Sequence, residues 1–522
     1  MEYLTDSPFV GGLMVILVLS VGWIYACHRK TVTSHNRLPP GPSGLPFVGN
    51  AFQMPSHNQE KVFASWAKQY GNIVYLQILG TDMVVLNSLD AARDLLEKRG
   101  SIYSDRPRFV LLSEMMGWEL ASTHMRYGPR FRKHRRFINQ FFNQKAVAGF
   151  RPLQEKEILI LLEGMMHDPD RFVDHLRRYA AAVILKITYG HDICSVNDLF
   201  VKLAQRAATM TIESGSPAAS LVDFFPALRH IPTWAPFSNF KIKAHETRRA
   251  VRDMMEIPFA QVKDSLRSGT AVPSYTSSLL ESHRVRDGHI AHDDEEDIKG
   301  SAGTLFSVGI VPFTNPAQTV ASIHTFLLAM LLYPKLLQKV QKEIDSVIGT
   351  ARLPNVDDRA SLPYLNCVLK EVIRWSPMVP LGMPHRLMED DFYQGYFIPA
   401  GTTIVANIFE ILRDCDQPDD FLPDRYLTNK SLVDPFEVVF GFGRRACPGR
   451  HLAESSYWLM AANIAATFDI SKMLNDKGED VNLTYGFEQF FVRHPKPFVC
   501  SIKPRSLDTV TLINHGKADL RS

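Results

Sequence analysis

One stretch near the C-terminus of the chain holds a cysteine in surroundings suited to chemistry. The stretch reads Phe440-Gly441-Phe442-Gly443-Arg444-Arg445-Ala446-Cys447-Pro448-Gly449-Arg450 and precedes a helix predicted over 453–468. Its glycines allow tight turns and a close approach of the backbone to a flat ligand. Its arginines and the start of the next helix favour a thiolate at Cys447. Such a thiolate is a ready axial ligand for haem iron, whereas a lone cysteine elsewhere is most often an inert, buried side chain.

Two further groups of charged residues have regular spacing. Glu371 and Arg374 lie three positions apart in a helix predicted over 362–375, so their side chains can pair on one face. Taken alone, this spacing indicates a surface pair, which stabilises a helix only slightly. The run 127–136 is strongly basic and also predicts a helix. It is either a solvated surface or a face for an anion or an acidic partner.

The elements that must position these residues can be predicted in outline. Strands are expected over 73–79 and 83–86, around a turn at 80–82. A helix should run from 298 to 309 and resume over 319–332. Pro312 and Pro316 stand between the two parts, and each proline inside a helix costs about 3 kcal/mol.

Composition excludes several classes of protein. The chain has 522 residues, of which 45% are hydrophobic and 22% charged, as in globular proteins. Its net charge of +3, without a long basic block, gives no sign of a nucleic-acid partner. Six scattered cysteines argue against a disulfide framework and for a reducing compartment.

The N-terminal region predicts a membrane anchor. Residues 9–27 form an apolar run without charge, about long enough to span a bilayer as a helix. A cleaved signal peptide is the alternative, but the acidic start and the lack of a cleavage pattern favour a retained anchor. Arg29, Lys30 and Arg37 follow the run, so the remainder is expected in the cytosol.

Four features in this order resemble the cytochrome P450 family. They are the anchor followed by Pro39-Pro40-Gly41-Pro42, the E-x-x-R pair, P-x-R-Y at 423–426, and F-x-x-G-x-R-x-C-x-G at 440–449. Residues 100–107 and 303–305 look like fungal microsomal members, of the type similar to O-methylsterigmatocystin oxidoreductase. The resemblance implies a mainly α fold with small β-sheets behind a single N-terminal transmembrane helix. Haem would lie between a distal helix and the cysteine loop.

The resemblance also implies roles for single residues. Cys447 is the expected thiolate ligand of the iron. The expected cofactor-binding residues besides it are Phe440, Gly443 and Gly449 in the loop around the sulfur, and Arg445, Arg135 and His385 toward the haem propionates. Glu371, Arg374 and Arg425 match a buried charge triad. Phe131 stands where the family has a tryptophan four residues before Arg135, so the indole N–H of that tryptophan is lost here.

The implied function is a haem-thiolate monooxygenase that inserts one atom of O2 into a small, apolar organic substrate. Haem b would be the cofactor, and electrons would come from NADPH through NADPH–cytochrome P450 reductase. Fungal secondary metabolism or xenobiotic oxidation is the expected setting, at the endoplasmic reticulum membrane. A positive surface for the reductase is expected from Arg130, Arg132, Lys133, Arg136, Arg444 and Arg450, with a merely solvated face as the alternative.

The same resemblance divides the chain into four parts. Residues 1–30 are expected to be the membrane anchor and 31–50 a proline-rich hinge. Residues 51–505 are expected to be the monooxygenase domain, and 506–522 a C-terminal tail.

The distal helix departs from the family's G-x-D-T-T-V pattern. Val320 follows Gly309 by eleven positions, so six residues are extra, and no acid lies between them. Three interpretations stay open. The segment bulges and Thr319 or Thr314, with water, replaces the acid–alcohol pair of a working monooxygenase; the enzyme performs haem-thiolate chemistry that needs no oxygen activation; or the segment is a translated intron. The alternative function is therefore a haem-binding protein with impaired or non-oxidative turnover.

Overall fold

The computed structural model describes most of the chain from residue 37 onward. The described range is 37–519, without 56, 194, 196, 215–219, 236–237, 285–288, 311–317, 474–478, 480–484 and 490–491. The predicted anchor at 1–30 lies outside the described residues. The chain divides into two compact units, Met1–Pro107 with Met383–Glu410, and Arg108–Gly382 with Ile411–Ser522.

The first unit is built on a four-stranded sheet. Its strand order is β1 (Ile73–Ile78), β2 (Thr81–Leu86), β6 (Thr403–Ala406) and β3 (His385–Arg386). The β2–β6 pair is parallel and the other two pairs are antiparallel. All four residues of β6 are buried, which fits a strand covered on both faces and made of small and β-branched side chains.

Both strands predicted in this sheet are confirmed, with a shifted turn. Leu79 and Gly80 have φ of 48° and 82°, and Ile78 pairs with Thr81. Two central residues at positive φ make the two-residue hairpin turn whose twist matches the strands. The turn is therefore shorter than the predicted one, and β2 begins at Thr81.

The described part of the predicted hinge, residues 37–50, contacts β1. Tyr75 N–H donates to the carbonyl of Pro40 at 2.9 Å, and Gln77 N–H donates to the Asn50 side chain at 2.9 Å. These bonds give the segment fixed partners in the sheet. The unit also contains the helix α2 (Gln59–Tyr70). Its remaining elements are short: η1 (Ala51–Gln53), α3 (Leu89–Ala92), η2 (Arg93–Lys98), α4 (Gly100–Tyr103), and the pair β4 (Asp391–Tyr393) and β5 (Tyr396–Ile398).

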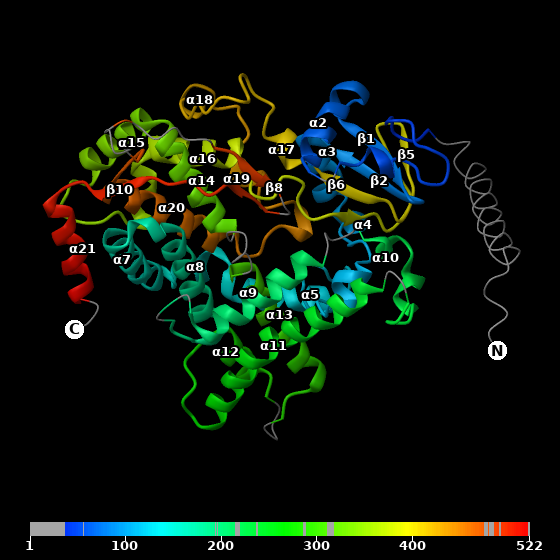
Figure 1. The fold of residues 1–522 in the computed structure, drawn as a ribbon, viewed down its shortest axis with the longest axis horizontal. Coiled ribbons are helices and arrows are strands. Elements are labelled where there is room, and N and C mark those ends of the chain that lie inside the picture. Colours follow the sequence, from blue (N-terminus) through cyan, green and yellow to red (C-terminus); the bar gives the residue numbers. More distant parts are fainter. Residues whose placement is uncertain are drawn as a thin grey trace, which may run out of the picture. The chain divides into compact units, whose positions relative to one another are not determined.

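The second unit is mainly helical (Figure 1). Its longer helices are α5 (Pro129–Phe142), α7 (Arg151–His167), α8 (Phe172–Tyr189), α9 (Leu199–Glu213), α11 (Asn239–Arg267), α12 (Tyr275–Ser282), α13 (His292–Ile310), α14 (Gln318–Leu332), α15 (Pro334–Val347), α16 (Pro363–Trp375), α20 (Arg450–Thr467) and α21 (Leu507–Asp519). Short elements join them: η3 (Val110–Met115), α6 (Gln144–Ala148), η4 (Pro169–Arg171), α10 (Leu221–Phe224), η5 (Pro226–His230), η6 (Val356–Ser361), α18 (Arg425–Thr428), α19 (Pro435–Val438) and η7 (Gly443–Arg445). Helix α17 (Ile408–Ile411) contains the boundary between the units.

Small sheets complete the second unit. β7 (Phe468–Ser471) pairs with β10 (Ser501–Pro504), and β8 (Phe487–Gln489) pairs with β9 (Arg493–Pro495). The described chain is thus mainly α with small sheets, as predicted.

The two parts of the predicted distal helix are confirmed as α13 and α14. The described helices end at Ile310 and begin at Gln318, so Pro312, Thr314 and Pro316 lie outside the described residues. Gly309 serves close packing here, because a Cβ at this position would lie 2.6 Å from Cγ1 of Ile184 on α8.

Between 37 and 519, with the gaps given above, no single helix is long and apolar enough to cross a bilayer. One bent pair, Thr319–Leu332 with Pro334–Val347, passes by length and composition, with an angle of 108° at its break.

The predicted C-terminal tail contains a helix. α21 lies beside α7 (Figure 1), Ile513 is fully buried, and a Cβ on Gly516 would lie 2.8 Å from Leu159. This helix therefore packs on the second unit.

Candidate active site

The cysteine loop closes on itself through backbone hydrogen bonds. Cys447 N–H donates to the carbonyl of Phe440 at 2.8 Å. Gly441 and Gly443 have φ of 75° and 55°, in the left-handed region that side chains disfavour. The loop is therefore a tight turn whose two ends meet, directly before α20.

The Cys447 thiol lies in an environment with opposing effects. The side chain keeps some accessible surface, although protein atoms surround the sulfur closely. This burial raises the pKa of the Cys447 thiol, while a hydrogen bond from the Gly449 N–H and the charges of Arg135 and Arg450 act to lower it. Burial is the largest of these effects, so the pKa of the Cys447 thiol lies above its ordinary value, while the N–H donor and the two arginines favour the thiolate form.

Two arginines connect the cysteine loop to neighbouring segments of the second unit. Arg135 on α5 donates to the carbonyl of Ala446 at 2.8 Å. Arg445, from the loop, donates to the carbonyls of Ser122 at 3.3 Å and Met125 at 2.8 Å. A guanidinium has five N–H donors, so one such side chain can bind backbone carbonyls and an anionic group together.

Phe131 has a definite role in this arrangement. Its ring centroid lies 3.6 Å from Cζ of Arg445, and the ring is buried. An aromatic face attracts a guanidinium and fixes its plane. The residue that replaces the expected tryptophan therefore orients Arg445.

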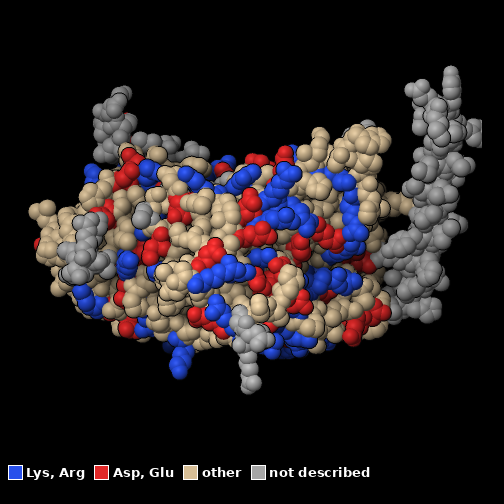
Figure 2. Space-filling model, turned by 90° about the horizontal axis from the view of Figure 1, so that it is seen from below, with Lys and Arg blue, Asp and Glu red and all other residues tan. Residues whose placement is uncertain are grey.

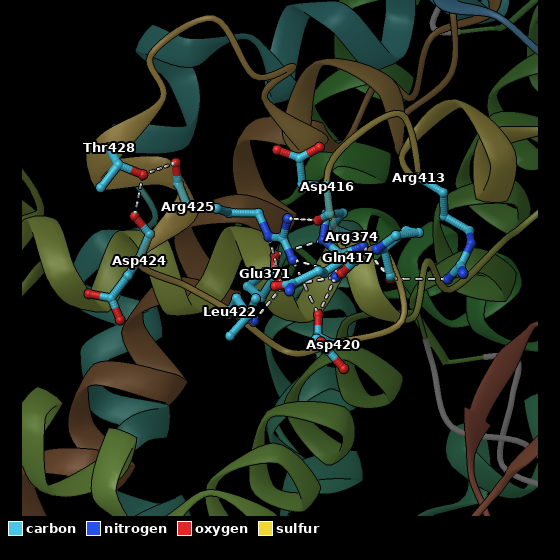
Figure 3. A network of polar contacts seen from close by, with 11 residues as sticks. Glu371, Arg374, Arg413, Asp416, Gln417, Asp420, Leu422, Asp424, Arg425 and Thr428 are labelled. Carbon is cyan, nitrogen blue, oxygen red and sulfur yellow. Dashed lines mark hydrogen bonds and ion pairs between the residues drawn. The ribbon is translucent and has the colours of Figure 1, made fainter.

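The predicted charge triad forms a buried network (Figure 3). Arg374 donates to both carboxylate oxygens of Glu371, at 2.7 and 2.8 Å, and Arg425 donates to Oε1 at 3.2 Å. The Glu371 and Arg374 side chains are 0% and 2% exposed. The i, i+3 spacing is thus part of a buried network, and the surface-pair interpretation is wrong.

The loop 413–420 completes this network, and sequence reasoning gave no account of it. Arg374 donates to the carbonyls of Pro418 and Asp420, at 2.8 and 2.9 Å. Arg425 donates to those of Asp416 and Gln417, at 2.5 and 3.1 Å. The acceptors are backbone atoms, which no residue type reveals.

The comparisons with known proteins agree with this geometry. The cytochrome P450 family model matches residues 39–501. The chain belongs to the cytochrome P450 family. Cytochrome P450 monooxygenase 136 of Postia placenta is 39% identical over 516 residues, which cover 97% of this chain and 96% of that protein. Cytochrome P450 monooxygenase claR of Ampulloclitocybe clavipes is 41% identical, covering 92% and 89%. Tryptamine 4-monooxygenase of Psilocybe cyanescens is 37% identical, covering 96% and 99%.

This membership establishes the enzyme class. The protein is a haem-thiolate monooxygenase, an oxidoreductase that uses haem b, O2, an organic substrate and electrons from NADPH through a reductase. The alternative of a haem-binding protein without turnover is not favoured. The finer resemblance to O-methylsterigmatocystin oxidoreductase stays a prediction.

The residues of this P450 fit a haem. The thiolate ligand would come from Cys447, whose side chain keeps some accessible surface and whose sulfur receives an N–H bond from Gly449. Arg135 and Arg445 bring two guanidinium groups to this loop. This donor set suits an iron porphyrin with two carboxylates.

His385 belongs to the first unit, on strand β3. Its Nδ1 lies 2.8 Å from the carbonyl of Tyr103 and therefore carries a proton that it donates to this oxygen. The bond fixes the ring and the tautomer. Its predicted role toward a propionate is untested.

The distal alcohols are only partly described. Thr319 is the second residue of α14 and is half-buried. Thr314 lies outside the described residues. The assignment of either as a proton donor stays a prediction.

The basic helix is held to the start of α13. Asp297 accepts from Arg130 at 2.5 Å, Lys133 at 2.6 Å and buried His134 at 3.2 Å, and Lys133 also pairs with Asp294. Burial acts to raise the pKa of Asp297, but the three donors outweigh it and hold the pKa below its ordinary value.

These pairs reduce the positive surface predicted from this region. The charges of Arg130 and Lys133 are paired with acids, so these two residues contribute less unopposed positive charge than predicted, although the Arg130 side chain is 48% exposed. Arg132, Arg136, Arg444 and Arg450 are exposed. On the face shown in Figure 2, basic and acidic side chains are interspersed.

We expect Glu371→Gln to lower the free energy of unfolding by about 3–5 kcal/mol, because it removes the charge that compensates two buried arginines. Urea denaturation followed by circular dichroism measures this. Asp264→Asn is the matched control, since Asp264 and Arg267 form an exposed pair with the same spacing and should contribute about 0–1 kcal/mol. A loss below about 1 kcal/mol in Glu371→Gln would contradict a stabilising triad.

We expect Asp297→Asn to destabilise the protein in a pH-dependent way. A carboxylate whose pKa is lowered by folding stabilises the folded state above its unfolded pKa, and this contribution is lost as the pH falls through the lower folded value. The advantage of wild type over the variant should therefore be complete above about pH 5 and shrink below about pH 4. Thermal midpoints between about pH 3 and 7 measure it, with Asp264→Asn as control. A difference in thermal midpoint that does not change with pH would refute a stabilising role for the ionised Asp297.

Proposed function

We propose that this P450 inserts one atom of O2 into a small, apolar organic compound in fungal secondary metabolism. The loop that presents Cys447, with its N–H donor and two flanking arginines, carries the proposal. The fungal monooxygenases similar over nearly the whole chain support it. An aromatic amine is one substrate class to test, since a relative is named tryptamine 4-monooxygenase.

Each residue of the site has a proposed role. Cys447 ligates the iron, and the loop residues Phe440, Gly443 and Gly449 shield the sulfur and donate N–H bonds to it. Arg135, Arg445 and His385 bind the propionates. Haem supplies oxygen activation when bound, and the hydroxyl of Thr319 or Thr314, with water, holds a proton on the distal side.

An apolar pocket is the proposed substrate site. Val110, Leu111 and Leu112 on η3 and Phe306 on α13 are buried in the second unit. They are its candidate walls, because apolar walls hold an apolar compound and exclude water.

The proposed electron donor is NADPH–cytochrome P450 reductase. Arg132, Arg136, Arg444 and Arg450 are exposed cations on α5 and around the cysteine loop. Arg444 also donates to the Tyr127 hydroxyl at 2.6 Å, which holds it at this surface. An acidic partner would be steered to these residues.

Attachment to the endoplasmic reticulum membrane is proposed from two regions. Residues 1–30 form the anchor, ahead of a segment 31–50, the catalytic domain 51–505 and the C-terminal part 506–522. A second contact is proposed at Leu221, Phe225 and Trp234, which are 62%, 47% and 84% exposed. Exposed aromatic and aliphatic side chains of this kind suit the membrane interface.

We expect the full chain, with a fungal reductase, NADPH and a panel of terpenoid and aromatic compounds, to incorporate one labelled oxygen atom from ¹⁸O2. Mass spectrometry of the product measures this, and Cys447→Ala should abolish it together with the red-shifted band of the reduced CO complex. Cys415→Ala is the control, because this free cysteine lies outside the loop. A normal CO band in Cys447→Ala would sink the ligand assignment.

We expect Arg132→Glu with Arg136→Glu to raise the reductase concentration needed for half-maximal haem reduction. The effect should shrink at high salt, because exposed charges are screened. Stopped-flow reduction under CO measures the rate. Arg252→Glu on α11 is the control, since Arg252 is 63% exposed and outside the proposed surface. Equal effects of both changes would argue against a specific docking face.

We expect Trp234 to enter the lipid. The fluorescence difference between wild type and Trp234→Phe should shift to the blue on adding vesicles, and brominated acyl chains should quench it. Trp66→Phe on α2 is the control, and its difference spectrum should not respond. A Trp234 signal unchanged by lipid would remove the second contact from the proposal.

A further inference from the structure

Thr304 on α13 makes a hydrogen bond outside its own helix. Its hydroxyl donates to the carbonyl of Gly300 at 2.8 Å and accepts the N–H of Ser122 at 3.0 Å. The side chain is 4% exposed. A buried hydroxyl used in both directions is costly to replace, because the Ser122 N–H would lose its partner.

The segment that Thr304 holds is the one that receives Arg445. Ser122 and Met125 offer their carbonyls to the two terminal nitrogens of this arginine, and Phe131 lies under its plane. Gly300 brings the segment close to α13, since a Cβ there would lie 2.7 Å from the carbonyl of Leu120. The hydrogen bond from the Ser122 N–H to the Thr304 hydroxyl therefore fixes the position of Ser122, whose carbonyl binds Arg445.

We propose that Thr304 is a positioning residue for the haem, because it sets the carbonyls that aim Arg445 at a propionate. The inference rests on the propionate role of Arg445 given under the proposed function. The proposed role connects the distal helix to the cysteine loop. A shift of α13 at Thr304 would move Ser122, and Ser122 would move the guanidinium of Arg445, two residues before Cys447.

The test compares Thr304→Val, which keeps the shape and removes the hydroxyl, with Thr304→Ser, which keeps the hydroxyl. Thr325→Val is the matched control, because the Thr325 hydroxyl is equally buried and donates to the carbonyl of Ala321 within its own helix. The readouts on the full-length holoenzyme are the rate of haem transfer to apomyoglobin and the reduction potential of the haem.

Thr304→Val should lose haem about fivefold faster, the factor expected for one hydrogen bond. Its reduction potential should shift, and Thr304→Ser should restore both values. Thr325→Val should behave as wild type. In an Arg445→Ala background, Thr304→Val should add no further effect, because both changes act on the same contact.

The outcomes separate the inference from the proposed function. If Arg445→Ala accelerates haem loss and Thr304→Val does not, the role of Thr304 is wrong and that of Arg445 stands. If Arg445→Ala has no effect, the propionate assignment fails, and the inference fails with it. Additive effects of the two changes would show that Thr304 acts on stability alone. Should Thr304→Val not fold, Thr304→Ala replaces it in the same comparison, with the same expected and contradicting results.

Discussion

A guanidinium that leaves water must be given acceptors, and the second unit of this P450 depends on how that requirement is met. Glu371 balances Arg374 and Arg425, but the remaining donors of these two arginines go to backbone carbonyls of the loop 413–420. Arg135 and Arg445 likewise bind carbonyls. Charged donors bound to a backbone fix the path of a chain without regular secondary structure. The cysteine loop and the 413–420 loop are both of this kind.

The sequence predicted those parts of the structure that side-chain type and spacing determine. Periodic apolar positions predicted α13, α14 and α16, and runs of strand-favouring residues around a turn predicted β1 and β2. The order of the motifs indicated the family. It also predicted the roles of Cys447 and of the triad formed by Glu371, Arg374 and Arg425. The surface-pair interpretation of Glu371 and Arg374 failed because spacing along a helix does not say which face is buried. Here Arg425, 54 residues after Glu371, completes the group.

The remaining features could not be predicted because their partners are backbone atoms or come from distant segments. Residue type does not show that the carbonyls of Ser122 and Met125 accept hydrogen bonds from Arg445, or that the N–H of Ser122 donates to Thr304. The ion pairs of Arg130 and Lys133 with Asp297 were missed for another reason. The cations of a basic helix look alike in sequence, and only packing against α13 shows that Arg130 and Lys133 pair with acids.

The C-terminal helix α21 bears on where this enzyme can be cut or tagged. Its buried Ile513, and Gly516 set against Leu159, cover part of α7. A protein ended at 505, the limit predicted for the catalytic domain, would leave that apolar part of α7 in water and invite aggregation or proteolysis. A purification tag belongs after residue 519, beyond the helix, and a frameshift in the last dozen codons would act as a folding defect even though the haem site is untouched.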